Sequence, residues 1–220
     1  MVYFEKSVTE PASLSKEKEK KRGTYLRTDV LLALCNDFKN KCYICELKQP
    51  TSINVEHFKP HKGNKDLKFD WKNLFWSCYH CNITKSSKFI NILNCTIYDD
   101  LVDRKIKYKI ETLPLKVKIE AIETSPKVIE TVKLLNAVYN GTAPLKLIEC
   151  KNLRKAIKKE IDLFRTSLLN FYTSTSPEFT MYYEQEIKDH LDISSNFTAF
   201  KRWVIFDDPK AKNDFEKYCV

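Results

Sequence analysis

Glycine is scarce in this chain, with three among 220 residues. This scarcity argues against β-sandwiches, barrels and glycine-rich phosphate loops, because their turns and close backbone approaches depend on glycine. Long hydrophobic runs are also missing, and none approaches the ~20 residues that a membrane-spanning helix requires. Residues 1–22 are charged and lack the apolar core of a signal peptide, so we expect no export and a cytoplasmic location.

The residues that are abundant favour helices. Lysine, leucine, isoleucine and glutamate are frequent, and 43% of residues are hydrophobic, enough for one sizeable domain or two small ones. Hydrophobic spacing and end signals predict helices over 28–39, 125–140, 145–172, 178–191 and 197–206. The charge run over 15–22 is interpreted as a solvated helix start or a mobile arm.

Positive charge is concentrated in the first half of the sequence. The formal net charge is +9, and residues 1–110 hold 21 Lys and Arg against 13 Asp and Glu. A basic half attracts polyphosphate chains through long-range electrostatics and counterion release. The same charge also improves solubility, so composition alone leaves both explanations open.

Eight cysteines do not predict a disulfide scaffold here, because the chain is long and shows no export signal. Four of them form two Cys-x-x-Cys pairs, Cys42/Cys45 and Cys78/Cys81, with 32 residues between the pairs. This pattern is typical of a tetrahedral zinc site. Four thiolates leave no open coordination position, so we expect this zinc to be structural.

The remaining cysteines are interpreted as ordinary buried or terminal thiols; they are Cys35, Cys95, Cys150 and Cys219. His80 lies inside the second Cys-x-x-Cys pair and could in principle replace a cysteine ligand. Because four thiolates already satisfy the metal, we expect His80 to be exposed or to face substrate.

Polar residues with catalytic potential lie between and just after the two cysteine pairs. Glu56 and His57 end a predicted strand over 53–58, and Asn73 follows sixteen residues after His57 at the start of a second strand over 73–76. Asn82 comes directly after Cys81, in a predicted helix over 79–90, and Lys85 follows one turn later. This arrangement resembles the HNH nuclease superfamily, whose zinc-stapled branch carries Cys-x-x-Cys pairs in the same places.

The resemblance implies an α+β fold in which a zinc-stapled ββα-metal core hydrolyses phosphodiester bonds. His57 would be the general base, while Glu56 and Asn82 would hold one divalent cation, Mg²⁺ by preference, through hard oxygen ligands. Asn73 would orient the loop or the His57 ring, and Lys85 would contact substrate phosphate. Glu56 stands where Asp is commoner and Asn82 where many members have His, which leaves the metal preference open.

The resemblance to the HNH superfamily becomes more specific when the residues that flank the motif are included. Glu-His-Phe-Lys-Pro, Asp-Trp-Lys-Asn-Leu-Phe, Cys-x-x-Cys-Asn-x-x-Lys and the upstream Cys-Tyr-Ile-Cys-Glu resemble the nuclease subunit of Septu antiphage defence systems, PtuB-like and including retron-associated members. Similarity continues upstream into Lys-Arg-Gly-Thr-Tyr and weakly into the helical half. The resemblance implies an ABC/SMC-like ATPase partner and a nucleic-acid substrate, with DNA the default and transfer RNA an alternative.

These observations predict three segments. Residues 1–41 would be an N-terminal arm and helix, 42–95 the zinc-stapled nuclease core, and 96–220 a mainly helical region that completes the core and docks a partner. Two other classes of function remain open. One is a catalytically silent zinc ribbon that binds nucleic acid or protein, and the other is a helical assembly module in which the zinc module serves as scaffolding. The combined presence of Glu56, His57, Asn73 and Asn82 favours the nuclease.

Overall fold

Helices dominate the computed structural model, which describes residues 1–219, and within that range the strands form two small antiparallel sheets. The fold is therefore α+β, as expected. The helices are α1 (Ala12–Glu19), α2 (Thr28–Asp37), α3 (Lys65–Phe69), α4 (Tyr79–Lys85), α5 (Pro126–Asn140), α6 (Pro144–Thr173), α7 (Pro177–Leu191), α8 (Thr198–Asp207) and α9 (Pro209–Phe215). The strands are β1 (Ile53–His57), β2 (Leu74–Cys78), β3 (Ile106–Thr112) and β4 (Leu115–Ala121). Short 3-10 turns cover Trp71–Asn73, Tyr98–Asp100 and Glu216–Tyr218.

Proline sets the start of the long helices in the second half. α5, α6 and α7 each begin with a proline at the first helical turn, where its missing N–H costs no internal hydrogen bond. Their boundaries agree with the predicted helices to within one residue at either end. α9 was not predicted, and α3 lies between the two predicted strands, where no helix was predicted.

The first sheet and the helix after it form one strand–strand–helix unit. β1 pairs antiparallel with β2, so that His57 lies opposite Leu74 and Ile53 opposite Cys78. α4 follows β2 without a loop and packs against both strands. α4 ends at Lys85, earlier than predicted, because Ser86 adopts a left-handed φ of 41° that stops the helix.

The second hairpin, β3–β4, carries alternating hydrophobic and charged residues. Ile106, Tyr108 and Ile110 are buried on one face, and the lysines between them face outward. The buried face packs against α5, α6 and α8.

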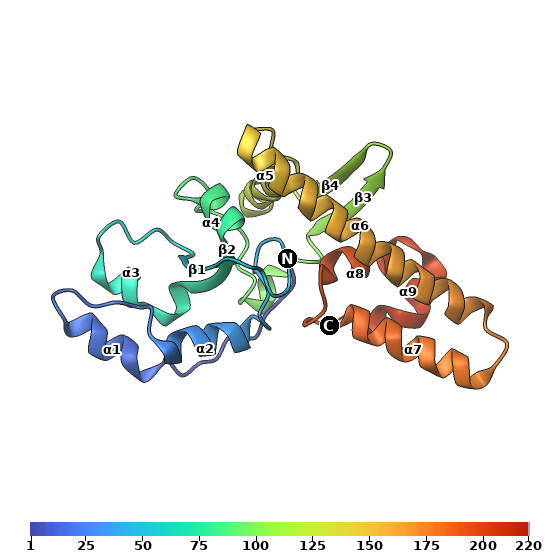
Figure 1. Cartoon of the computed structure of the whole chain (residues 1–220), viewed down its shortest axis with the longest axis horizontal. Coiled ribbons are helices and arrows are strands. Elements are labelled where there is room, and N and C mark those ends of the chain that lie inside the picture. The colour runs from blue at the N-terminus through green and yellow to red at the C-terminus, as the bar shows by residue number, and fades with distance from the viewer. Residues whose placement is uncertain (220) are drawn as a thin grey trace.

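The main hydrophobic core joins segments that are distant in sequence. It includes the first residues of the chain, the β1–β2 sheet, the β3–β4 hairpin, α5 and the start of α8. A second cluster, with Phe164, Ile187 and Phe215 among its members, holds α6, α7 and α9 together. In Figure 1, α1–α3 and α7–α9 lie at opposite ends of an elongated molecule, and α6 runs from the centre to the α7–α9 end.

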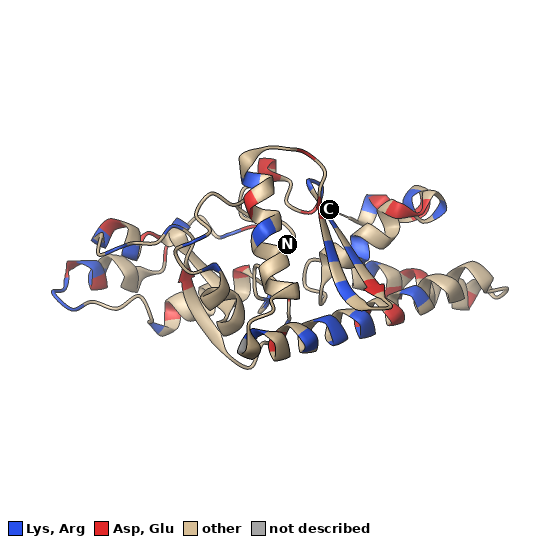
Figure 2. Ribbon diagram, turned by 90° about the horizontal axis from the view of Figure 1, so that it is seen from above, with Lys and Arg blue, Asp and Glu red and all other residues tan. Residues whose placement is uncertain are grey.

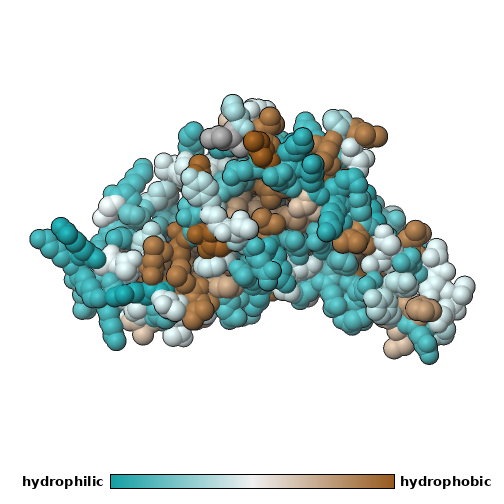
Figure 3. Space-filling view, in the orientation of Figure 1, coloured by the Kyte–Doolittle hydropathy of each residue, from teal (hydrophilic) through white to brown (hydrophobic). Residues whose placement is uncertain are grey.

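The face shown in Figure 3 is mostly hydrophilic, with hydrophobic side chains gathered over α2. Leu26 before α2 is 53% exposed and Leu32 within it is 65% exposed. Among the described residues, no helix combines the length and the hydrophobicity needed to cross a bilayer.

Candidate metal centre and active site

The two cysteine pairs meet at one buried point. The Sγ atoms of Cys42, Cys45, Cys78 and Cys81 all lie within 4.8 Å of one another, and all four residues are buried. Four convergent sulfur donors match the tetrahedral, thiolate-rich coordination that zinc takes in structural sites. The cluster therefore can hold a metal ion, and zinc fits its donor set.

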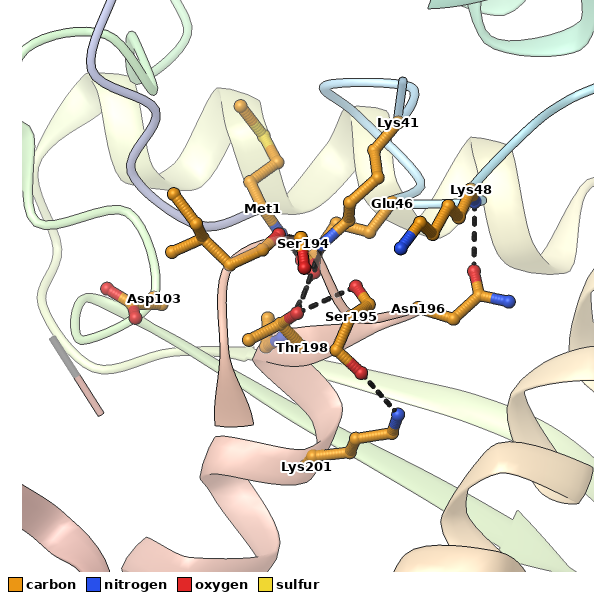
Figure 4. A network of polar contacts seen from close by, with 12 residues as sticks. Met1, Lys41, Glu46, Lys48, Asp103, Ser194, Ser195, Asn196, Thr198 and Lys201 are labelled. Carbon is orange, nitrogen blue, oxygen red and sulfur yellow. Dashed lines mark hydrogen bonds and ion pairs between the residues drawn. The ribbon is translucent and has the colours of Figure 1, made fainter. Parts of the chain in front are cut away.

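A network of buried charges fixes the first cysteine pair to the C-terminal half. Lys41 donates to the carbonyl of Ile193 at 2.7 Å and to Thr198 Oγ1 at 3.0 Å. Glu46 Oε2 accepts from the Ala199 N–H at 3.1 Å, and the Met1 ammonium lies 2.6 Å from Glu46 Oε1. Figure 4 shows these side chains converging between the first cysteine loop and the start of α8. The metal cluster is thus anchored to residues about 150 positions away.

His57 is the last residue of β1, and one of its two ring nitrogens is hydrogen-bonded while the other can still accept a hydrogen bond. Nε2 lies 3.0 Å from the carbonyl of Lys68, so Nε2 carries the proton and donates it, leaving Nδ1 as an acceptor. Burial lowers the pKa of His57; the hydrogen bond to the Lys68 carbonyl acts against this fall, and the charges of His61, Lys68 and Lys85 add to it. The lowered pKa favours the neutral imidazole, which is the form that a general base requires.

Glu56 points to the opposite side of the strand from His57, as neighbours in a strand do. It is 5% exposed; its Oε2 accepts from Tyr43 Oη at 2.6 Å, and its Oε1 lies 2.6 Å from Lys85 Nζ. Burial raises the pKa of Glu56, while Lys85 and Tyr43 act against that rise. Both carboxylate oxygens are thus held by protein groups.

Lys85 does not lie where the expected contact with substrate phosphate requires it. Its side chain is fully buried, and Nζ also donates to the carbonyls of Phe58 at 2.9 Å and His57 at 3.3 Å. A charged group in the interior needs partners, and Glu56 with the two carbonyls supplies them. Lys85 therefore ties α4 to the end of β1 instead of facing solvent.

Asn73 holds the loop that follows His57. Its Oδ1 accepts from the Lys59 N–H at 2.7 Å, and its Nδ2 donates to the carbonyls of Lys59 and Leu67, both at 2.9 Å. The side chain is 4% exposed. One carboxamide thus fixes both sides of the loop between β1 and α3.

Asn82 differs from the other motif residues because its side chain is free. It lies on α4 one turn before Lys85 and is half-buried. Within residues 1–219 the carboxamide makes no hydrogen bond to protein. Its oxygen is available as a hard ligand.

The expectation that His80 is exposed or faces substrate is wrong. His80 is 8% exposed, with Nδ1 2.5 Å from Glu149 Oε2 and Nε2 2.8 Å from the carbonyl of Val138. It is neither exposed nor an additional member of the cysteine cluster. Instead, it ties α4 to α5 and α6, and both partners are too distant in sequence for a local pattern to reveal.

Three residues near the motif were not singled out by the sequence. Tyr43 binds Glu56, the ring of Tyr25 meets the His57 ring edge-on at 4.8 Å, and the His61 ring lies 4.7 Å from it. Tyr25 belongs to the Lys-Arg-Gly-Thr-Tyr stretch, so the upstream similarity was its signal. Gly23 in that stretch is required, because an added Cβ would lie 1.8 Å from the carbonyl oxygen of Glu17.

Comparison with known proteins finds a distant relative. No protein-family model matches the chain. Septu protein PtuB from Bacillus thuringiensis is 27% identical over 171 residues, which cover 64% of this chain and 66% of that protein. The matched part is thus slightly less than two thirds of each protein. By this similarity the chain is a distant relative of Septu protein PtuB.

Proposed function

We propose that this chain is a metal-dependent HNH endonuclease and the effector subunit of a Septu-type antiphage defence complex. The observation that carries the proposal is the setting of His57. It ends a strand of a strand–strand–helix unit, its Nε2–H is held by a backbone carbonyl, and its Nδ1 is left to accept a proton. Phosphodiester hydrolysis needs such a base to take a proton from the attacking water.

The surrounding residues support this role. Asn73 fixes the loop after His57, and Lys68, whose carbonyl orients the ring, lies at the far end of that loop in α3. The cysteine cluster ties the Cys42–Cys45 loop to the junction of β2 and α4. These contacts would orient the imidazole before substrate arrives.

A catalytic cation is the second part of the proposal. Asn82 offers a free carboxamide oxygen. Glu56 is buried on the other side of β1 from His57, and its oxygens are held by Lys85 and Tyr43 but keep lone pairs for a further bond. Hard oxygen donors of this kind favour Mg²⁺. Bound there, a divalent cation would offset the charge that develops on the phosphate and the leaving oxygen.

The domain organisation follows from the same proposal. Residues 42–95 would be the nuclease core, residues 1–41 its N-terminal support, and residues 96–220 the part that completes the core and docks an ABC/SMC-like ATPase. The relationship to Septu protein PtuB supports a role in defence. A silent zinc module would need the same cysteines but would have no use for an oriented, neutral His57.

The proposal is tested by isolating the chain alone and together with a candidate ABC/SMC-like ATPase partner. Each preparation is incubated with labelled duplex DNA and with transfer RNA, with Mg²⁺ and without added divalent cation. We expect Mg²⁺-dependent internal cleavage of one substrate class. A complex that retains zinc, binds nucleic acid and cuts neither substrate would instead identify a binding module.

A further inference from the structure

α6 separates its charges onto two flanks. Lys151, Lys155 and Lys159 recur every fourth residue, so they share one side of the helix, and all three are exposed. Among the described residues none of the three has an ion-pair partner. Figure 2 shows the row of Lys and Arg along α6.

Two of the three acidic residues of α6 are used in contacts with other elements. Glu149 binds His80 at 2.5 Å, and Glu160 binds Lys201 at 2.9 Å, both on the flank away from the lysine row. Asp162 is the exception, and it is neutralised by Lys158. The internal contacts therefore leave the opposite flank with excess positive charge. Like charges four residues apart destabilise a helix slightly, so this row brings no benefit to the fold.

The β3–β4 hairpin extends the positive surface. Lys109 and Lys118 lie directly opposite each other in the antiparallel ladder, and both are exposed. Lys118 is paired with Glu120 at 2.7 Å, so Lys109 is the member of this pair that adds positive charge to the surface. Lys109 and Arg165 of α6 line the same cavity of about 230 Å³, so the hairpin and the helix meet there. Asp207 and Asp208 also line it, and Asp207 is paired with Lys107.

We propose that Lys151, Lys155, Lys159 and Arg165 of α6, with Lys109 of β3, form a surface that binds the phosphate backbone of nucleic acid. We call it the α6–β3 basic surface. It deepens the proposed nuclease function by naming how substrate is held away from the cutting residues. Ammonium groups contact phosphates regardless of base sequence, so binding is sequence-independent.

The dimensions suit several phosphates. Lys151 and Arg165 are fourteen residues apart, which spans ~21 Å along a helix. Phosphates on one strand of a duplex recur every ~3.4 Å along its axis, so about six fit this length. A substrate contacted here and at His57 would have two independent points of attachment.

The test compares two triple variants with equal loss of charge. The first variant replaces Lys151, Lys155 and Lys159 with Gln and so removes the lysine row on α6. The matched control replaces Lys16, Lys21 and Arg22 with Gln. These three cations lie in or near α1, are exposed and have no ion-pair partner among the described residues. Both are made in the full chain carrying His57→Ala, and binding to labelled duplex DNA and to an RNA hairpin is measured by anisotropy over a series of salt concentrations.

We expect the α6 variant to weaken duplex binding by about tenfold or more, and to lower the slope of log K against log salt by about 2.7. The control should keep both values. The DNA and RNA arms show which backbone the surface prefers. Unchanged binding by the α6 variant, or a larger loss in the control, would overturn the proposal.

A second readout separates this inference from the proposed function. Bis(p-nitrophenyl) phosphate is a small diester that cannot span the α6–β3 basic surface. With His57 restored, the α6 variant should hydrolyse it as the unmodified complex does. Absence of hydrolysis by the unmodified complex would count against the nuclease, while the binding result would still decide the role of α6.

Discussion

Lys85 Nζ lies 2.6 Å from Glu56 Oε1 in the interior, joining the helix after the cysteine cluster to the strand that ends in His57. Removing one member of a buried ion pair leaves the other uncompensated, and this typically costs about 3–5 kcal/mol. We therefore expect Lys85→Met to lower the free energy of unfolding by an amount in that range, measured by urea denaturation.

The double variant Lys85→Met with Glu56→Gln is the control for charge. Because it removes both ions, its loss of stability should be smaller than that of Lys85→Met alone. Equal stability of Lys85→Met and the unmodified protein would show that Lys85 is not a structural ion partner.

Asn73→Ala should impair activity more than folding. The change leaves the Lys59 N–H and the Lys59 and Leu67 carbonyls without their partner, at a cost of about 1–3 kcal/mol for an unsatisfied buried group. The loosened loop no longer fixes the His57 ring, so the cleavage rate should fall by more than about tenfold.

Asn64→Ala is the matched control in the same loop. Asn64 caps α3 by accepting from the Leu67 N–H, and it is exposed. Its loss should cost about 1 kcal/mol of stability and leave the cleavage rate nearly unchanged. A similar loss of cleavage in both variants would show that Asn73 has no special role in orienting the loop.

Cys78→Ser should release zinc and destabilise the chain. The variant removes one of four convergent thiolates, and structural zinc sites supply folding free energy directly. Cys95→Ser is the control, since Cys95 is equally buried but lies outside the cluster. Zinc per chain is measured by mass spectrometry and stability by thermal unfolding; retention of zinc by Cys78→Ser would contradict the assignment.

Glu46 should make stability depend on pH below neutrality. Burial alone would raise the pKa of Glu46, but the Met1 ammonium and Lys41 overcome this and lower it from 4.5 to about 2. A carboxyl with a lowered folded-state pKa contributes stability above its unfolded pKa, and that contribution is lost as pH falls from about 4.5 towards 2. The shift corresponds to roughly 3 kcal/mol.

The expected result concerns the difference between the unmodified protein and Glu46→Gln. In urea denaturation that difference should be largest above pH 5 and should shrink on acidification to pH 3. Release of zinc at low pH affects both proteins, so the comparison isolates Glu46. A difference that stays constant with pH would indicate that Glu46 is not ionised in the folded protein.

Local patterns predicted much of this architecture. The two strands, α4 and the proline-started helices follow from hydrophobic spacing and end signals that lie within a few residues. Contacts of His80 with α5 and α6, and of Glu46 with Met1 and Ala199, could not be predicted, because these partners are 45 to 153 positions away. The burial of Lys85 was missed for a similar reason, since only the packing of α4 on β1 brings Glu56 to it.

The basic flank of α6 was not predicted, because net charge was counted over the whole second half of the sequence. Residues 111–220 hold 17 Lys and Arg against 16 Asp and Glu, which suggested a neutral half. Within 144–165, however, seven Lys and Arg stand against three Asp and Glu, and the fold uses two of those acids internally. Net charge over a long segment therefore concealed a local excess.

His57→Ala, compared with His190→Ala, tests the central claim most directly. His190 is half-buried on α7, outside the proposed catalytic residues, and controls for loss of an imidazole. The cleavage rate of labelled nucleic acid by the complex with its ATPase is measured in Mg²⁺, with zinc content checked in each variant. We predict a fall of about 100-fold or more for His57→Ala and near-normal cleavage for His190→Ala. Undiminished cleavage by zinc-loaded His57→Ala would contradict the account.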